Sequence, residues 1–475
     1  MSKKIPPHRR AIVFQGGGAL GAYEVGYYHA LYERFVEKKE FDTPFDVVVG
    51  TSIGAINGAL LVGYFQKNQT WEGSVEHLKE FWKYISSPAN FSDVATEMWN
   101  SWRKYFPEAP SKEISRRLFS VNEFIFRGVP NVFAQPKYRV DNQFYGLAPP
   151  WFQANNQALK ESLEKFIDFP IATDYEKDEP RLLLVAVDVQ EAVPVVFDSY
   201  KQADGKRETI YGQKRDTKDG KATGGFLIEY DGIEADHILA SSNVPITYDY
   251  TKLKAKEING TDTNNGKEVT RYFWDGGLLH NTPLVPLIVY FKRFWDDYIS
   301  IEKQREAVYS GNEDQTNHPE LYAYIVDMWS KKSKSVPDNF NDTMSRYNEI
   351  MLADKTEFEE HIMAGVNEDV AMFKELLQLA KDKGASKEEL EKILMKPIKT
   401  QFRAGVKRAR IDRIRGRFPL KIIRIQRRDD PDDVANQMMD FSPKTIETLF
   451  KEGYEDSKKS LENVFHDERE KLRLD

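Results

Sequence analysis

Short runs of branched apolar residues that end in glycine are the clearest pattern in the chain. Residues 11–14 (AIVF) lead into Gly16-Gly17-Gly18, and residues 47–49 (VVV) lead into a second glycine turn at 50–54. Each turn is followed by apolar residues at helical spacing, over 19–38 and 55–65. The pattern therefore predicts two successive strand–turn–helix units.

Such units predict a parallel sheet with helices on both faces, because right-handed crossovers place each helix against the sheet. We therefore expect a three-layer α/β/α fold with a mostly parallel central sheet, and both glycine turns at the same edge. Three further apolar runs predict strands at 181–188, 192–198 and 269–274. Polar stretches at 201–225 and 260–267 are typical of an exposed excursion and a turn.

The composition of the chain changes after residue 310. The pattern there predicts a strand at 321–329, helices over 339–400, a basic strand at 420–425 and a closing helix from Pro443. We expect a catalytic domain over 9–300 and a mostly helical C-terminal extension over 310–475. A length of 475 residues accommodates both.

The composition of the chain limits which nucleophiles and which partners are possible. The chain has 40% hydrophobic, 13% aromatic and 30% charged residues, which is typical of a globular protein. It has no cysteine, so thiol nucleophiles and disulfides are excluded. Its net charge of −7 argues against nucleic acid as a partner. We find no metal-ligand spacing and expect neither metal nor cofactor, and the short apolar run behind the N-terminus predicts a cytoplasmic protein.

Ser52 lies in the pattern Gly50-Thr51-Ser52-Ile53-Gly54, at a predicted strand-to-helix junction. Small neighbours allow a serine to stand exposed in a strained turn, as a nucleophile requires. A serine at a helix start is also typical of an N-terminal cap, and the pattern alone does not separate the two roles.

The first glycine turn suits an oxyanion hole. Consecutive glycines at the start of a helix can direct backbone N–H groups at a developing negative charge, and the candidates are Gly16, Gly17, Gly18, Ala19 and Gly21. The same residues fit the dinucleotide pattern G-x-G-x-x-G, which expects an acidic residue at the end of the next strand. Asp46 precedes that strand instead, so the dinucleotide interpretation is the weaker one.

Asp275 follows a third predicted strand and is followed by Gly276 and Gly277. A carboxylate in that position is a candidate base for the Ser52 hydroxyl. An ordinary aspartate, with a pKa of about 3.9, is a weak base for serine, so the site has to be dry. Considered alone, the residue is also typical of an Asp-Gly turn.

The three glycine turns, in this order, resemble those of the patatin-like phospholipases, which are serine lipid acyl hydrolases with a Ser–Asp dyad. The resemblance is strongest over 9–293, where residues 236–245 (DHILASSNVP) also resemble the family's helix before the aspartate strand. It implies that Ser52 is the nucleophile, that Asp275 is its base, and that 16–21 supplies the oxyanion hole. It also implies a phospholipid or another acyl-ester lipid as substrate, with peripheral membrane contact.

Two positions depart from the family pattern. Leu20 stands where many members have Arg or Lys, and His280 stands where Asn is common. His280 leaves open an α/β-hydrolase-type esterase with a Ser–His–Asp triad. A non-catalytic, membrane-associated protein with the same fold is a further alternative, although Ser52 and Asp275 are both present.

Two other stretches suggest contact with lipid. Residues 403–428 hold eleven Lys or Arg against one acidic residue, Asp412, which favours anionic headgroups or a merely solvated surface. Residues 70–165 are rich in aromatic side chains, which suit the wall of an apolar pocket.

Overall fold

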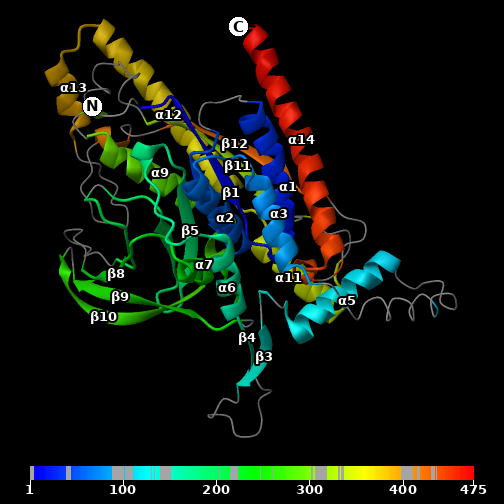
Figure 1. Cartoon of the computed structure of the whole chain (residues 1–475). Coiled ribbons are helices and arrows are strands. Elements are labelled where there is room, and N and C mark those ends of the chain that lie inside the picture. The colour runs from blue at the N-terminus through cyan, green and yellow to red at the C-terminus, as the bar shows by residue number, and fades with distance from the viewer. Residues whose placement is uncertain are drawn as a thin grey trace.

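The computed structural model has one long sheet flanked by helices (Figure 1). It describes residues 5–38, 44–87, 101, 111–129, 131–132, 134–139, 151–202, 204–213, 223–245, 248–259, 262–300, 303–304, 318–329, 332, 336–396, 410–413, 418–428, 434 and 436–474.

Five strands form the parallel half of the sheet, in the order β12-β11-β1-β2-β5. Their bounds are β1 (His8–Phe14), β2 (Val47–Thr51), β5 (Arg181–Asp188), β11 (Glu320–Asp327) and β12 (Leu420–Gln426). Every residue of β2 and β5 is buried, which explains why their sequences are continuous apolar runs rather than alternating ones. The predicted strands and their parallel pairing are confirmed.

The other half of the sheet is antiparallel and continues from β5 in the order β10-β9-β8-β7, while β6 also pairs with β5. Its strands are β6 (Val193–Asp198), β7 (Glu208–Tyr211), β8 (Gly225–Glu229), β9 (Thr251–Asn259) and β10 (Asp262–Asp275). A separate hairpin pairs β3 (Ala134–Arg139) with β4 (Trp151–Asn155).

The pairing of β5 determines where the second and third glycine turns lie. Along one edge, residues 183–188 of β5 pair with β6. Its other edge therefore holds both β2, which ends with Thr51 opposite Val185, and β10, which ends with Asp275 opposite Ala186. Two strands running in opposite directions thus end beside adjacent residues of one neighbour. Consequently, the residue after Thr51 lies next to Asp275.

Alternate residues of the parallel strands face two separate cores. Ile12 and Phe14 of β1 belong to the larger core, whereas Ala11 and Val13 belong to a second core on the opposite face. The larger core contains side chains of α1 (Gly21–Tyr32), α2 (Ile53–Asn68), α3 (Ser74–Ile85) and α7 (Ala235–Ser242), and the second contains those of α9 (Leu284–Tyr298). The predicted three-layer α/β/α architecture is confirmed.

The remaining helices include α5 (Lys112–Arg127), α6 (Gln157–Phe166), α8 (Gly277–His280), α11 (Phe340–Leu352), α12 (Glu357–Asp382), α13 (Lys387–Leu394) and α14 (Pro443–Leu474). Short helical turns are η1 (Gly18–Leu20), the π-helical η2 (Glu33–Glu37), η3 (Tyr175–Lys177), η4 (Arg410–Arg413) and η5 (Gln437–Met439). Strands β11 and β12 complete the parallel half, so the predicted catalytic domain (9–300) and extension (310–475) share one sheet.

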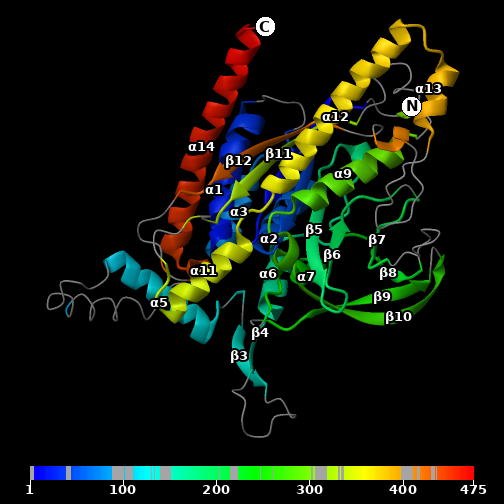
Figure 2. The same ribbon diagram turned by 180° about the vertical axis from the view of Figure 1, so that it is seen from behind.

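The closing helix α14 lies along α1 (Figures 1 and 2). Glycines make this approach close: a Cβ on Gly26 would lie 2.0 Å from the Phe450 carbonyl oxygen, and one on Gly453 would lie 2.1 Å from that of Tyr23. The Tyr23 hydroxyl also donates to Asp456 at 3.0 Å. The C-terminal helix is therefore packed, backbone against backbone, on the helix that follows the first glycine turn.

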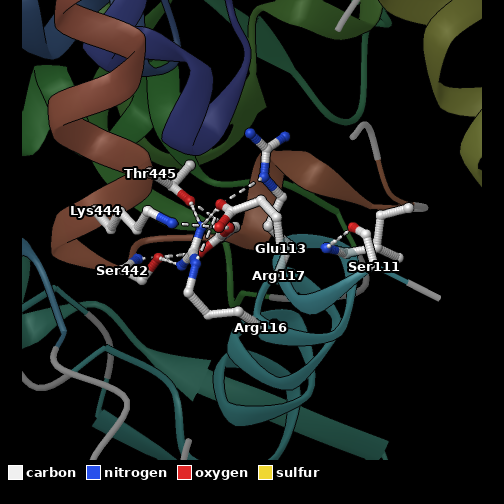
Figure 3. Close-up of polar contacts among 9 residues, drawn as sticks. Ser111, Glu113, Arg116, Arg117, Ser442, Lys444 and Thr445 are labelled. Carbon is white, nitrogen blue, oxygen red and sulfur yellow. Dashed lines mark hydrogen bonds and ion pairs between the residues drawn. The ribbon is translucent and has the colours of Figure 1, made fainter. Parts of the chain in front are cut away.

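A polar cluster joins the start of α14 to α5 (Figure 3). The Arg116 guanidinium donates to Glu113 and to Thr445, both at 2.6 Å, and also to Ser442. Lys444 pairs with the same carboxylate of Glu113. Burial opposes ionisation there, but hydrogen bonds from Arg116 and Lys444 outweigh it and lower the pKa of Glu113 to about 2. The contacts fix the chain just after η5.

Two expectations about polar segments were wrong in detail. The stretch 201–225, expected to be an exposed excursion, contains β7, and Thr209 of this strand is buried. The stretch 260–267, expected to be a turn, is mostly strand because β10 begins at Asp262. Strand β7 pairs with β8 and strand β10 with β9, both antiparallel, so their backbone groups are satisfied without a continuous apolar run. Residues 203, 214–222 and 260–261 lie outside the described residues.

The aromatic segment is also used differently from what was expected. Phe81 and Trp82 are fully buried in the larger core and belong to helix packing. Trp99, Trp102 and Phe106 lie outside the described residues, and so do the side chains of Phe126 and Trp151.

We expect Gly453→Ala to lower the free energy of unfolding by about 1–3 kcal/mol, because the new methyl group would overlap the Tyr23 carbonyl. The matched control is Gly365→Ala in α12, where nothing lies within 4 Å of an added Cβ; it should stabilise by about 0.5–1 kcal/mol. Urea denaturation of both variants provides the measurement. Equal effects of the two substitutions would contradict the packing of α14 against α1.

Candidate active site

Ser52 occupies a strained turn between β2 and α2. Its backbone has φ 57° and ψ −125°, a conformation that non-glycine residues rarely adopt. A Cβ on Gly50 would lie 2.2 Å from the Gly54 carbonyl oxygen, so the turn is tight enough to require glycine. The Ser52 side chain makes no helix-capping hydrogen bond. This geometry fits a displayed nucleophile and not a simple cap.

The Ser52 hydroxyl lies beside the Asp275 carboxylate and favours its ionised form, and the same carboxylate accepts the Gly277 N–H at 2.7 Å. The backbone on both sides is held by α7: the N–H groups of Ser52 and Gly276 donate to the Ser241 carbonyl at 3.1 and 3.3 Å. The Ser241 hydroxyl in turn donates to the carbonyl of Val185 at 2.6 Å. One serine of α7 thus ties both turns to β5.

Burial changes the acid–base properties of Asp275, whose carboxylate has no cationic partner among the residues that the structure describes. Loss of solvation raises the pKa of Asp275 to about 6, although hydrogen bonds from Ser52 and Gly277 act in the opposite direction. The carboxylate is therefore ionised at neutral pH and is a stronger base than an exposed aspartate.

The first glycine turn lies directly against the nucleophile, since a Cβ on Gly16 would lie 3.0 Å from that of Ser52. The Gly16 N–H donates to the Asn281 side chain at 3.1 Å and is therefore occupied. Within the described part of the chain, the N–H groups of Gly17 and Gly18 have no hydrogen-bond acceptor. The Ala19 N–H likewise has no acceptor among the described residues, so these three donors of the predicted set stay free for an oxyanion.

Ala19 and Gly21 have packing roles in the structure. Ala19 is fully buried in η1. The Gly21 N–H bonds back into η1, and a Cβ on this residue would lie 2.4 Å from Ile53, the residue after the nucleophile. The two positions bring α1 against the start of α2.

A buried polar network behind the glycine turn was missed by the sequence analysis. Glu24 is fully buried and accepts the Gln15 N–H at 2.7 Å and the Asn57 side-chain amide at 2.9 Å. Trp82 donates to the same Asn57 at 2.9 Å. Burial raises the pKa of Glu24 well above its ordinary value. The only sequence signal was a polar residue at 24 and at 57 with mostly apolar neighbours on either side.

The structure does not assemble a Ser–His–Asp triad. The backbone carbonyl of His280 accepts the Thr51 hydroxyl at 3.0 Å, and the only charged side chain that influences its ring is Glu359. Burial lowers the pKa of His280, and no hydrogen bond joins its ring to Ser52 or Asp275, all three of which are described residues. The side chain of Asn281, the residue after His280, contacts the glycine turn at Gly16 instead.

The acidic residue that would bind a ribose hydroxyl does not lie at the end of β2, where the dinucleotide pattern places it. Asp46 lies before β2, where it accepts the Arg10 N–H at 2.7 Å and pairs with the Arg9 guanidinium. That places its carboxylate at the opposite end of the strand from Ser52, so a dinucleotide site is not supported.

Several cations of the basic stretch 403–428 have acidic partners within the chain. Arg424 pairs with Asp354 at 2.7 Å and with Glu360 at 3.1 Å, and Arg428 pairs with Asp456. Residues 403–409 and 414–417 lie outside the described residues. The described cations therefore support internal structure more than an anion-binding surface.

The described residues contain neither a metal-binding cluster nor a membrane-spanning helix. No group of three or more His, Asp and Glu side chains is arranged to hold a metal ion. No helix among these residues combines the length and apolarity needed to cross a bilayer.

The chain belongs to the patatin-like phospholipase family, because the sequence model of that family matches residues 12–288, more than half of its length. A second model, described as patatin phospholipase, matches residues 378–472. The family is one of lipid hydrolases, and this defines the general class of the protein. No curated protein gives a significant match to the sequence.

Solved structures to which the chain shows similarity include VipD from Legionella pneumophila, with 12% identity, a TM-score of 0.30, and coverage of 97% of this chain and 68% of VipD. The type III effector ExoU has 11% identity, a TM-score of 0.22, and coverage of 97% and 54%. Human GIVD cytosolic phospholipase A2, solved with methyl gamma-linolenyl fluorophosphonate, has 16% identity, a TM-score of 0.19, and coverage of 42% and 24%. At these scores the likenesses carry no residue assignments.

We expect Asp275→Asn to be more stable than the wild type above pH 6. The pKa of Asp275 is about 6 in the native state and 3.8 in the unfolded state. Between pH 3.8 and pH 6 the native state therefore binds more protons than the unfolded state, and the wild-type stability falls as the pH rises through this range. Asparagine has no charge to bury, so Asp275→Asn should raise the free energy of unfolding by up to about 3 kcal/mol at pH 8. Its difference from the wild type should vanish near pH 4.

Denaturation at both pH values measures this difference, with Asp188→Asn as the control. Asp188 is fully buried on β5 but pairs with Arg271 at 2.7 Å, and that pairing outweighs burial to lower its pKa. Its replacement should destabilise, because Arg271 loses its partner. Destabilisation of Asp275→Asn at pH 8 would refute the account of the buried base.

Proposed function

We propose that the protein is a serine lipid acyl hydrolase of the phospholipase A or lysophospholipase type. The placement of the Ser52 hydroxyl beside the buried carboxylate of Asp275 carries the proposal. Ser52 Oγ attacks the ester carbonyl while its proton passes to Asp275. The protonated Asp275 then returns the proton to the leaving alcohol oxygen, and the acyl group stays on Ser52.

Water completes the cycle in the proposed mechanism. Asp275, ionised again, accepts a proton from a water molecule that attacks the acyl-enzyme, and the fatty acid leaves as Ser52 recovers its proton. The raised pKa of Asp275, about 6, supports both transfers. The Gly17 and Gly18 N–H groups would stabilise the two oxyanions, an effect typically worth about 10²–10³-fold in rate for one donor.

The site also supports a lipid substrate delivered from a surface. Leu278 and Leu279, which follow the aspartate turn directly, are 40% and 47% exposed. Apolar side chains at the edge of a site favour contact with acyl chains or a bilayer surface. We therefore propose a phospholipid or a related acyl ester as substrate, for a cytoplasmic protein that touches membranes peripherally and needs no cofactor.

Fatty-acid release from defined phospholipids, lysophospholipids and acylglycerols tests this function. Ser52→Ala should lower the rate by at least about 10³-fold, because no nucleophile replaces the hydroxyl. A fluorophosphonate probe should label the wild type and leave Ser52→Ala unlabelled.

The control for labelling is Ser162→Ala in α6, which removes another buried hydroxyl, one that is bonded to the Asn131 carbonyl. It should keep both labelling and hydrolysis. Equal hydrolysis by wild type and Ser52→Ala on every lipid would overturn the proposal.

A further inference from the structure

The glycine turn is held by residues that lie far away in the sequence. Strands β1 and β11 are parallel neighbours, with Val13 opposite Ile325, so their carboxyl ends emerge side by side. Just beyond β11, the Met328 N–H donates to the Gln15 side chain at 2.9 Å. The Trp329 indole N–H donates to the Gly16 carbonyl at 2.8 Å. Both donors lie outside the matched stretch 12–288.

The Gly16 carbonyl has a second donor. The Asn281 side-chain amide reaches it at 3.1 Å and also donates to the carbonyl of Leu352, at the end of α11, at 2.5 Å. Gly16 is therefore fixed at its N–H and twice at its carbonyl oxygen. Trp329 and Asn281 are 3% and 6% exposed, so water does not readily replace them as donors.

This arrangement has a consequence for Gly17, because its N–H belongs to the same peptide group as the Gly16 carbonyl. In a planar trans peptide the C=O and N–H bonds point in opposite directions. A restraint on the Gly16 oxygen therefore sets the direction of the Gly17 N–H. Without such a restraint, a peptide between two glycines rotates at little cost, since glycine tolerates both signs of φ.

Tight packing leaves the turn little space to move. A Cβ on Gly17 would lie 2.8 Å from the Met328 side chain and 3.6 Å from the Trp329 ring. Gly18 has φ +55°, and a Cβ there would lie 2.4 Å from the Met438 carbonyl oxygen of η5. The polar cluster around Arg116 fixes the chain shortly after η5 (Figure 3). Two segments of the C-terminal half of the chain, one with Met328 and Trp329 and the other with Met438, thus enclose the glycine turn.

We propose that Trp329 is a positioning residue for the oxyanion hole: its indole N–H holds the Gly16–Gly17 peptide in the orientation that directs the Gly17 N–H at the reacting carbonyl. This proposal rests on the hydrolase function proposed above. It assigns the C-terminal half a direct role in transition-state stabilisation. Because the developing oxyanion needs this donor more than the ground-state ester does, the effect falls on kcat.

Steady-state hydrolysis of a defined phospholipid by Trp329→Phe tests the proposal. Phenylalanine keeps an aromatic side chain at this position but has no N–H donor, so we expect kcat to fall about 10–100-fold with KM changed less than about 2-fold. The matched control is Trp295→Phe, because Trp295 is 2% exposed but lies in the second core, on the other face of the sheet. It should keep the wild-type kcat.

Asn281→Ala removes the other donor to the Gly16 oxygen, and it should show the same loss of kcat even if Trp329→Phe fails to fold. Wild-type hydrolysis no faster than that of Ser52→Ala overturns the hydrolase function and the positioning role together. An active wild type with unchanged kcat in folded Trp329→Phe overturns the positioning role alone. A fall in kcat equal to that of Trp295→Phe also overturns it, because the effect would then be structural.

Discussion

Everything about the candidate site depends on one edge of β5. Thr51 and Asp275 lie opposite adjacent residues, Val185 and Ala186, on two strands that approach from opposite directions. The strand pairing therefore brings a serine and an aspartate together that are far apart in the sequence. Ser241 bonds to the backbone of both turns and to Val185, which fixes their spacing. The sheet thus determines how close the Ser52 hydroxyl lies to the Asp275 carboxylate.

The burial that activates Asp275 also costs stability. A carboxylate without a cation partner is poorly solvated, and its raised pKa expresses that cost. Elsewhere the chain pairs its buried aspartates with arginine, as Asp188 with Arg271 and Asp198 with Arg181. The contrast between Asp275 and these pairs is typical of a functional site, where stability is given up for reactivity.

The sequence predicted the parallel strands and the two glycine turns of the N-terminal part well, because continuous apolar runs ending in glycine have few other structures. It did not show how Asp275 reaches Ser52, since β10 is antiparallel and strand order is not written in local patterns. The contacts of Glu24, Trp329 and Asn281 with the glycine turn also escaped notice. Each depends on distant segments, and a single Trp or Asn carries no periodic signal. The catalytic roles of Ser52, Asp275 and the glycine turn remain predictions.

The most direct test of the central claim is the pH dependence of kcat/KM for phospholipid hydrolysis, measured in the wild type and in His280→Ala. Below its pKa Asp275 is protonated and cannot accept the serine proton, so the rate should fall on the acidic side with an apparent pKa of about 6. The ordinary pKa of histidine, about 6.5, is close to this value and burial lowers that of His280, so His280→Ala is needed to separate its titration from that of Asp275. The account predicts the same acidic limb in both proteins. Loss of the limb in His280→Ala, or a wild-type rate that stays constant down to pH 4.5, would contradict it.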